Sequence, residues 1–369
     1  MTGPRYPAHI SALPSTVPFV GPEAQERRLG RGFAARIGAN ENVFGPSPTA
    51  IAAMQTAASD IWKYADPENH DLKAALAERL DCSASNIVVG EGIDGLLGYL
   101  VRLLVSRGDH VVTSDGAYPT FNYHVAGFGG VLHKVAYVDD HEDPQSLMAK
   151  AHETGAKIVY LANPDNPMGT WQSGVTIEKA LDDLPSGCIL VLDEAYVEFA
   201  PQIAIPNIDP NDPRVIRLRT FSKGYGMAGA RVGYGIGAPE LITSFDKIRN
   251  HFGMNRAAQI GALAALGDDG WLLHVQKQVA EARIRINGIA DDNGLSTLPS
   301  ATNFVAVDCG KDGAFARSVL AQLTAHGIFV RMPFVAPQDR CIRIGAGTRA
   351  DLDLLAEVFP RVLAQANAS

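Results

Sequence analysis

Residues 86–105 read Asn86-Ile-Val-Val-Gly-Glu-Gly-Ile-Asp-Gly-Leu-Leu-Gly-Tyr-Leu-Val-Arg-Leu-Leu-Val105. The stretch contains a short apolar run, a glycine turn and a longer apolar run, which predict a buried strand up to Val89 and a helix from Leu96. Strand, glycine turn and helix in this order place free backbone N–H groups at the start of the helix. We therefore expect an anion-binding turn at residues 90–95.

The same alternation of strands and helices continues to about residue 240. Strands are predicted at residues 110–113, 131–137, 157–161, 188–192, 215–220 and 231–236, with helices between several of them, as at 144–154 and 175–183. Continuous apolar strands that alternate with helices are typical of a mostly parallel sheet covered on both faces. The sequence thus predicts an α/β fold whose ligands bind at the carboxyl ends of the strands.

The pattern changes after about residue 240 and predicts a second, smaller α+β unit. Helical segments dominate residues 239–292, and short strands then alternate with helices at 313–326 and 350–366. The predicted domains are an irregular N-terminal arm at 1–36, a large domain at 37–245 and a small C-terminal domain at 246–369. We expect the arm to pack on the small domain or on a partner subunit.

Composition excludes several classes of function. The chain of 369 residues has a net charge of −8 and a pI near 5.7, which argues against a nucleic-acid binder. It contains no apolar run long enough to cross a bilayer and no signal-peptide pattern, so we expect a cytoplasmic protein. The four cysteines and ten histidines show no spacing typical of metal ligands, and we expect no metal site.

Polar side chains follow the predicted strands at their carboxyl ends. Asn166, Asp193 and Tyr118 each lie just after an apolar run, and Lys223 lies in the stretch 220–237, which is rich in glycine and otherwise uncharged except for an arginine eight positions later. Desolvation and a nearby cation both favour the neutral form of a lysine. A neutral amine is the nucleophile that condenses with a carbonyl group.

Together these side chains match the needs of pyridoxal 5′-phosphate. Its aldehyde requires an amine, for which Lys223 is the candidate, and its ring nitrogen requires a carboxylate, for which Asp193 is suited. The large domain would hold this cofactor. The other expected contacts of the cofactor are Asn166 and Tyr196 at the phenolic oxygen, Gly92, Ile93, Asp94, Ser222 and Arg231 at the phosphate, and Tyr118 against the ring face.

Several short motifs resemble those of one enzyme family. The signatures of fold-type I, class I/II aminotransferases are matched by Asn163-Pro-Asp-Asn-Pro167, Asp193-Glu-Ala-Tyr196, and Ser222-Lys223 with Arg231. The resemblance narrows to the histidinol-phosphate aminotransferase group through Asn-Glu-Asn-x-x-Gly-Pro-Ser-Pro at 40–48, Tyr-x-Asp-Pro at 64–67 and Gly-x-Asp at 92–94. It extends over about residues 36–360.

The resemblance implies a homodimer with its active sites at the interface. Lys223 would hold the cofactor and carry the proton, and Tyr64 would reach the phosphate in the neighbouring subunit. The resemblance also implies three substrate-binding residues. Arg343 would bind an amino acid carboxylate, Arg331 would bind a substrate phosphate, and Asn42 would also contact the substrate.

Some positions depart from the family pattern. Met168 stands where a small hydroxyl residue is usual, and Ile93 and Gly95 also differ from the common residues of the phosphate turn. Because backbone donors survive such changes, they bear on substrate choice rather than on cofactor binding. Met168, Phe44, Tyr123 and Phe334 are candidates to shape a pocket for an aromatic side chain.

Our leading hypothesis is an aminotransferase that moves an amino group between an amino donor and a keto acid or keto phosphate, with histidinol phosphate as the first candidate substrate. An aromatic amino acid aminotransferase and a decarboxylase of phosphorylated amino acids, which would share the cofactor site, remain alternatives. A sensing module of a transcription regulator would need a DNA-binding domain, for which the arm at 1–36 is too short. Each motif also has a purely structural interpretation. Taken alone, Asp193 could cap an element of secondary structure, and Arg231 could be a surface charge.

Overall fold

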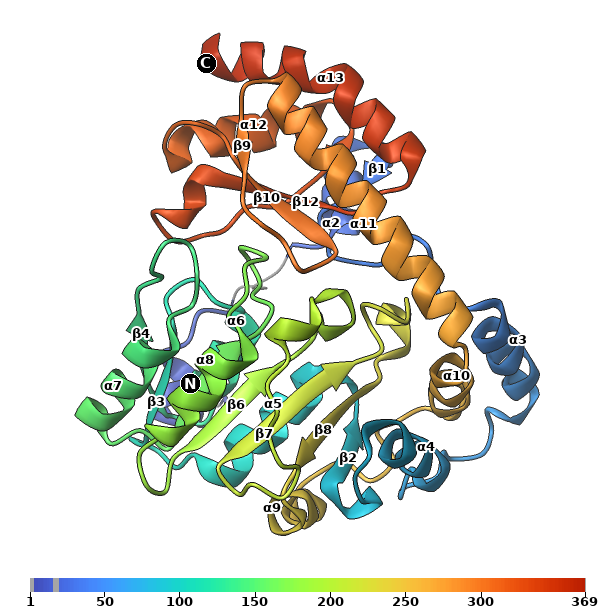
Figure 1. The fold of residues 1–369 in the computed structure, drawn as a ribbon, viewed down its shortest axis with the longest axis vertical. Helices are drawn as coiled ribbons and strands as arrows, with labels where there is room; N and C mark the ends of the chain where they lie inside the picture. The colour runs from blue at the N-terminus through green and yellow to red at the C-terminus, as the bar shows by residue number, and fades with distance from the viewer. Residues whose placement is uncertain (1–2, 16–19, 369) are drawn as a thin grey trace.

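The computed structural model describes residues 3–15 and 20–368 and contains a seven-stranded central sheet (Figure 1). Along the sheet the strands lie in the order β2 (Ile87–Gly90), β8 (Gly233–Gly237), β7 (Val215–Thr220), β6 (Ile189–Asp193), β5 (Ile158–Ala162), β3 (His110–Ser114) and β4 (Val131–Val135). The neighbours from β7 to β4 are parallel, and β8 is antiparallel to both β7 and β2. The predicted mostly parallel α/β fold is confirmed.

Helices cover both faces of this sheet. Successive strand residues point to opposite faces and therefore pack in different cores. Val111 of β3 packs in a core with α5 (Gly92–Leu104), α6 (Pro119–Gly127) and α9 (Pro239–Ser244), whereas the next residue, Val112, packs in a core with α7 (Pro144–Thr154) and α8 (Gly174–Asp182). Burial on both faces explains why the strands read as continuous apolar runs.

A third core lies at the β2 end of the sheet. There α3 (Pro48–Ala57), α4 (His70–Leu80) and α10 (Arg256–Leu266) pack together against β2 and β8. The division between the large and small domains at residue 245 stays a prediction, although α10 lies beyond that residue and packs with the large sheet.

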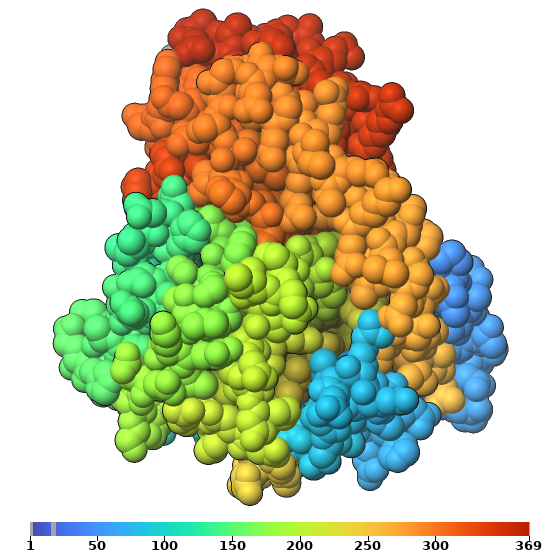
Figure 2. All heavy atoms as spheres, viewed as in Figure 1, coloured from blue at the N-terminus to red at the C-terminus, as the bar shows by residue number. Residues whose placement is uncertain are grey.

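The smaller α+β unit has its own antiparallel sheet, in the order β12 (Cys341–Gly345), β10 (Phe304–Asp308) and β9 (Ser296–Thr297). Its core also includes the long helix α11 (Asp269–Asp292), α12 (Gly313–Ala325) and α13 (Arg349–Ala368). In Figure 2 this unit, coloured orange to red, lies directly over the large unit, coloured green, yellow and cyan. The site described below lies where the two units meet.

The N-terminal segment is less irregular than predicted. It contains α1 (Ala8–Ser11) and α2 (Pro22–Leu29), and its β1 (Ala35–Arg36) pairs in parallel with β11 (Ile328–Phe329). Helix α2 begins with a proline at its first position and ends at a glycine with φ of 67°, two terminal signals that outweigh the proline-rich surroundings. Residues 1–2 and 16–19 of the predicted arm lie outside the described residues, as does residue 369 of the predicted small domain.

Among the other boundaries that differ from the prediction, two bear on the site. The strand expected from Arg231 begins at Gly233, because Arg231 adopts a left-handed conformation with φ of 57° that a strand does not accommodate. The helix expected from Leu96 begins at Gly92, so the glycine turn forms the first turn of α5. Within the described part of the chain, no helix is long and apolar enough to cross a membrane.

Candidate active site

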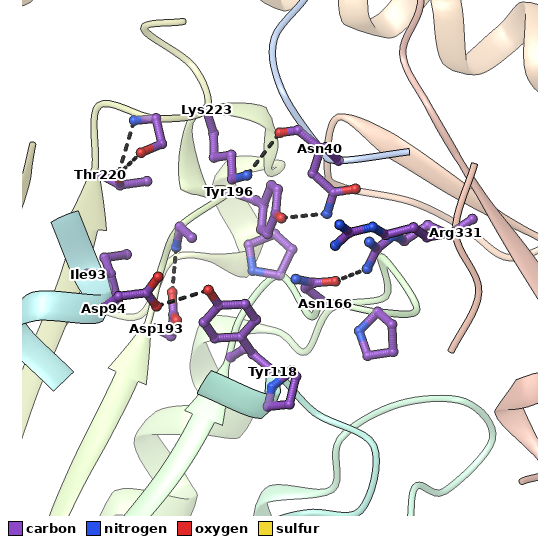
Figure 3. Close-up of a pocket in the computed structure, with 18 of the residues that line it drawn as sticks. Asn40, Ile93, Asp94, Tyr118, Asn166, Asp193, Tyr196, Thr220, Lys223 and Arg331 are labelled. Atoms are coloured by element: carbon purple, nitrogen blue, oxygen red, sulfur yellow. Dashed lines mark hydrogen bonds between the residues drawn. The ribbon is translucent and has the colours of Figure 1, made fainter. Parts of the chain in front are cut away.

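A cavity of about 320 Å³ lies at the carboxyl ends of the central strands, beneath the small unit (Figure 3). Eleven of the predicted site residues line it: Ile93, Asp94, Tyr118, Asn166, Asp193, Tyr196, Ser222, Lys223, Arg231, Arg331 and Arg343. In Figure 3, Ile93 and Asp94 lie on one side of the pocket, Arg331 lies on the other, and Lys223 and Tyr118 extend from opposite edges. The parallel sheet thus brings together residues that are far apart in sequence.

Lys223 follows β7 and presents its amine to the cavity. Its Nζ donates a hydrogen bond to the backbone oxygen of Asn40 at 2.9 Å and lies 5.5 Å from the centre of the Tyr196 ring. Burial, and then the positive charges of Arg343 and Arg231, lower the pKa of Lys223 to about 8. A substantial fraction of the amine is therefore neutral near pH 8, as a nucleophile must be.

Asp193 ends β6 and lies buried at the cavity wall. The Tyr160 hydroxyl donates to its Oδ2 at 2.7 Å, and the backbone N–H of Ala195 donates to its Oδ1 at 2.9 Å. Burial raises the pKa of Asp193 to about 6, although both donors oppose that change. A cation beside this carboxyl would stabilise its ionised form.

The start of α5, Ser222 and Arg231 form a group of donors suited to an anion. Arg231 Nη1 donates to Ser222 Oγ at 3.3 Å, and Arg231 Nη2 lies 3.8 Å from Asp94 Oδ2. Gly92, at the first position of the helix, has φ of 80°, and a Cβ there would lie 2.4 Å from Arg231 Nη2. Gly92 itself is outside the cavity lining, but its missing side chain leaves the space that Arg231 occupies.

Tyr118 precedes α6, where Pro119 starts the helix. Its hydroxyl donates to Asp94 Oδ1 at 2.9 Å, and burial raises its pKa well above the usual value for tyrosine. The Asp94 side chain is therefore engaged with Tyr118, which leaves only the backbone of this residue to contact an anion at the helix start.

The small unit contributes two arginines to the cavity. Arg331 and Arg343 form an isolated bridge through their backbones, so their side chains start from adjacent positions. Arg343 Nη1 donates to Asn166 Oδ1, and the guanidinium lies 5.0 Å from the centre of the Phe304 ring. Burial lowers the pKa of Arg343 to about 10 and also lowers that of Arg331. Two desolvated cations at one wall favour an anionic ligand group.

Besides Gly92, two predicted site residues do not line the cavity of this chain. Asn42 does not line the cavity; its Nδ2 donates to the backbone oxygens of Lys223 at 3.1 Å and of Gly224 at 3.3 Å, so it supports the lysine from behind. Tyr64 is 78% exposed and contacts the ring of Phe252, with 4.8 Å between ring centres. Its exposure is what a residue needs if it acts outside its own chain.

Of the four residues expected to shape a pocket for aromatic side chains, only Phe334 lines the cavity, at 72% exposure. Met168 is fully buried against Ala306 and Cys341, and Phe44 packs on the core of the small unit. The expectation for these two was wrong because both side chains meet core residues, not the cavity. Tyr123 is exposed on α6 and does not line the cavity either.

Sequence reasoning missed Asn40, whose Nδ2 donates to the Tyr196 hydroxyl at 2.9 Å while its backbone oxygen accepts from Lys223. It also missed Tyr160, the donor to Asp193. Tyr160 lies within the apolar run of β5. The signal in the sequence was its hydroxyl, which needs a hydrogen-bond partner when it is buried. Across the described residues, no group of histidine, cysteine, aspartate or glutamate side chains is arranged to hold a metal ion.

The fold and the site define a known class of enzyme. The family model for aminotransferase class I and II matches residues 35–359, and the chain belongs to this family. It is a pyridoxal phosphate-dependent transaminase, which takes an amino group from a donor and passes it to a keto acceptor.

Individual relatives within this family show to which of its members the chain is similar. The chain is 32% identical to histidinol-phosphate aminotransferase of Moorella thermoacetica, over 98% of this chain and 94% of that protein. It is 34% identical to the enzyme of the same name from Roseiflexus castenholzii, over 96% of each chain. Among solved structures, histidinol-phosphate aminotransferase from Sinorhizobium meliloti in complex with pyridoxal 5′-phosphate is 55% identical and superimposes with a TM-score of 0.94 over 98% of each chain.

Proposed function

We propose that this transaminase uses histidinol phosphate as its amino donor or product. The observation that supports this most is the pair of arginines at one wall of the cavity, Arg343, which is buried, and Arg331, which is partly buried. Arginine binds phosphate and carboxylate through paired hydrogen bonds, so one wall can serve both a phosphorylated amine and a carboxylate-bearing partner. Relatives named for histidinol phosphate support the same substrate.

The cavity fits the cofactor. Lys223 would hold its aldehyde, and Asp193 would pair with its ring nitrogen. The other contacts we propose are Ser222, Arg231 and the backbone at Gly92, Ile93 and Asp94 for the phosphate, Asn166 and Tyr196 for the phenolic oxygen, and Tyr118 against the ring. When bound, the cofactor supplies a reactive carbonyl and a ring that withdraws electrons from the bond being broken.

The chain's own residues would do the rest of the chemistry. Lys223, with its pKa lowered to about 8, can take a proton from the substrate carbon and return it at another position. Asp193 keeps a negative charge beside a protonated ring nitrogen. Arg331 and Arg343 hold the anionic end of the substrate, which fixes the reacting carbon near Lys223 Nζ.

A half-reaction screen tests the substrate. The purified enzyme with bound cofactor is mixed with single amino compounds, and the loss of the aldehyde-form absorbance is followed. We expect histidinol phosphate to react fastest, and Arg331→Gln to raise its KM by about tenfold or more, the cost of losing a charge-assisted contact. If histidinol phosphate leaves the spectrum unchanged while phenylalanine or tyrosine changes it, the substrate assignment is wrong.

An aromatic amino acid aminotransferase is the second candidate, and Phe334 at the cavity mouth is the observation that favours it. An apolar ring at this position would contact the side chain of a phenylalanine or tyrosine as readily as an imidazole. Phe334→Ala should lower kcat/KM for aromatic amino acids more than for aliphatic ones. Equal losses for both classes would remove this candidate.

We also propose that the enzyme acts as a homodimer in the cytoplasm and that Tyr64 reaches the cofactor phosphate of the partner subunit. Trp62 and Tyr64 are each 78% exposed, and Phe252 beside them is also exposed, which is unusual for three neighbouring aromatic residues of a monomer. Sedimentation should give a dimer. Mixing inactive Lys223→Ala with Tyr64→Ala subunits should restore part of the activity if each site uses residues of both chains, whereas a monomeric protein would contradict the proposal.

A further inference from the structure

Arg340 of the small unit forms ion pairs with acids of both units. It ends the short helix η7 (Gln338–Arg340) and directly precedes β12. Its Nη1 and Nη2 donate to Asp140 Oδ1 and Oδ2 at 3.0 and 2.6 Å, and its Nε donates to Asp308 Oδ2 at 2.7 Å. Asp308 ends β10 of the small unit, whereas Asp140 lies between β4 and α7 of the large unit. The ion triad of Asp140, Arg340 and Asp308 therefore joins the two units.

The ion triad is largely shielded from water. The side chains of Arg340, Asp140 and Asp308 are 26%, 21% and 22% exposed, and the two parallel hydrogen bonds to Asp140 fix the orientation of the guanidinium. On the large unit, Asp140 has φ of 61° and Asp139 has φ of 47°. Such left-handed conformations are uncommon outside glycine and persist where the surroundings hold them, as the Thr170 hydroxyl does by donating to the Asp140 backbone oxygen at 2.9 Å. Asp140 thus offers Arg340 a fixed carboxylate.

The segment that Arg340 closes, residues 331–340, forms part of the cavity wall. Its residues 331–334 line the cavity. Val335 then lies against the large unit, because a Cβ at Gly116 would be 3.5 Å from the Cβ of Val335. Arg340 therefore fixes to the large unit the end of a segment whose beginning contacts the ligand space.

The same segment determines where both arginines of the cavity lie. Arg331 is its first residue, and Arg343 follows three residues after its last. The backbone N–H of Arg343 donates to the oxygen of Arg331 at 2.6 Å, and the return hydrogen bond measures 3.4 Å. A shift of the segment on the large unit would therefore move both guanidinium groups relative to Lys223, which belongs to the large unit.

We propose that Arg340 is a positioning residue, which holds the 331–340 segment on the large unit through Asp140 and so sets the place of the two cavity arginines relative to Lys223. The inference rests on the proposed function, since it gives these two arginines the anion-binding role. A contribution to stability alone is the competing interpretation, because breaking a largely buried ion pair destabilises a fold wherever it lies.

The two acids of the ion triad form a matched pair of variants. Asp140→Asn removes the charge that Arg340 binds across the units, and Asp308→Asn removes the charge that it binds within the small unit. Asparagine keeps the shape of aspartate and tolerates the left-handed conformation of residue 140. The measurements are KM and kcat of the half-reaction with histidinol phosphate, thermal unfolding, and hydrogen exchange of the backbone amides in residues 331–340 of the cofactor-free protein.

We expect Asp140→Asn to raise KM by about tenfold with kcat within about threefold, because the anion is held in both the ground state and the transition state. Its amides in residues 331–340 should exchange faster than those of the wild type. Asp308→Asn should leave KM within about twofold and the exchange unchanged, although both variants unfold at a lower temperature. A normal KM in Asp140→Asn, or an equal rise in both variants, would overturn the proposal.

Two further arms keep the test decisive. If Asp140→Asn does not fold, Arg340→Lys replaces it, because lysine keeps the charge but cannot bind Asp140 through two nitrogens while it also reaches Asp308. A KM about tenfold higher then supports the positioning role, and a KM within about twofold refutes it. A wild type that does not react with histidinol phosphate refutes the proposed substrate alone. The variants are then compared with the α-amino acid that reacts fastest, whose carboxylate needs the same arginines.

Discussion

Replacing Lys223 by methionine should stabilise the protein when no cofactor is bound. In the folded chain the pKa of Lys223 falls from 10.5 to about 8, with burial as the main cause. One pH unit corresponds to ~1.4 kcal/mol, so protonating this amine costs at most ~3.5 kcal/mol more in the folded than in the unfolded chain. Methionine has a similar length and no charge, and it removes this cost.

The sign of the pH dependence follows from the same values. Between about pH 8 and 10.5 the unfolded chain binds more protons at this lysine than the folded chain, so the wild-type stability rises with pH across that window. The advantage of Lys223→Met should therefore be greatest below pH 8 and should disappear as pH approaches 10.5. Loss of the hydrogen bond to Asn40 offsets about 1 kcal/mol of the gain.

Urea unfolding of the cofactor-free protein at pH 7 and pH 9.5 measures the effect. Lys157→Met is the matched control, because Lys157 is about half exposed and pairs with Asp109 at 2.7 Å on the surface. Such a pair contributes only ~0.2–1 kcal/mol, so the control should be slightly less stable than the wild type at both pH values. If Lys223→Met is no more stable than the wild type at pH 7, or if its advantage does not shrink at pH 9.5, the lysine is not held in a desolvated site.

Three further substitutions test other parts of the site. Asp193→Asn should retain the fold but lower kcat by ~100-fold or more in the half-reaction, since a neutral amide cannot keep a ring nitrogen protonated; a loss below tenfold would contradict that role. Gly92→Ala should weaken cofactor retention on dialysis, because its Cβ would lie 2.4 Å from Arg231 Nη2 and φ is 80°; unchanged retention would show that Arg231 moves aside freely. Glu194→Gln should lower the midpoint of urea unfolding at pH 7 by the equivalent of ~3 kcal/mol, because it removes a buried charge that pairs with two largely buried arginines, Arg217 and Arg219.

The sequence predicted those parts of the site that depend on strand ends. Lys223, Asp193 and Asn166 each lie at or just after the end of a predicted strand, and parallel strands place their carboxyl ends along one edge of the sheet. No knowledge of side-chain contacts was needed to group them. The same rule explains why the α/β class of the large unit was predicted correctly. The start of β8 was placed two residues too early because nothing in the sequence showed that Arg231 adopts a left-handed conformation.

No comparable pattern in the sequence predicts the contacts between loops that are far apart along the chain. Asn40 and Lys223 are 183 residues apart, and the hydrogen bond between them uses a backbone oxygen, which every residue type possesses. The positions of Asn42 and Met168 likewise depend on how the loop at 40–48 and the small unit close over the sheet. A motif identifies a residue as part of such a loop, but it does not say which way the side chain points.

Asp193 and Glu194 are neighbouring acids whose pKa values the fold shifts in opposite directions. They are adjacent at the end of β6, so their side chains leave the strand on opposite sides. Burial pushes the pKa of both acids upward, but Arg219 and Arg217 bind Glu194 at 2.7 and 2.8 Å and lower its pKa below the usual value.

Among the described residues, the donors to Asp193 are neutral and no cation pairs with it, and its pKa is raised to about 6. Glu194 thus contributes stability that is present above about pH 4.5 and is lost as pH falls through its lowered folded pKa. Asp193 gains a comparable partner only from a cationic ligand. Asp193 lies without a described cationic partner at the wall of the cavity, whereas Glu194 beside it pairs with two arginines, and this difference supports the role that we propose for Asp193. It could not be predicted from the Asp-Glu sequence alone.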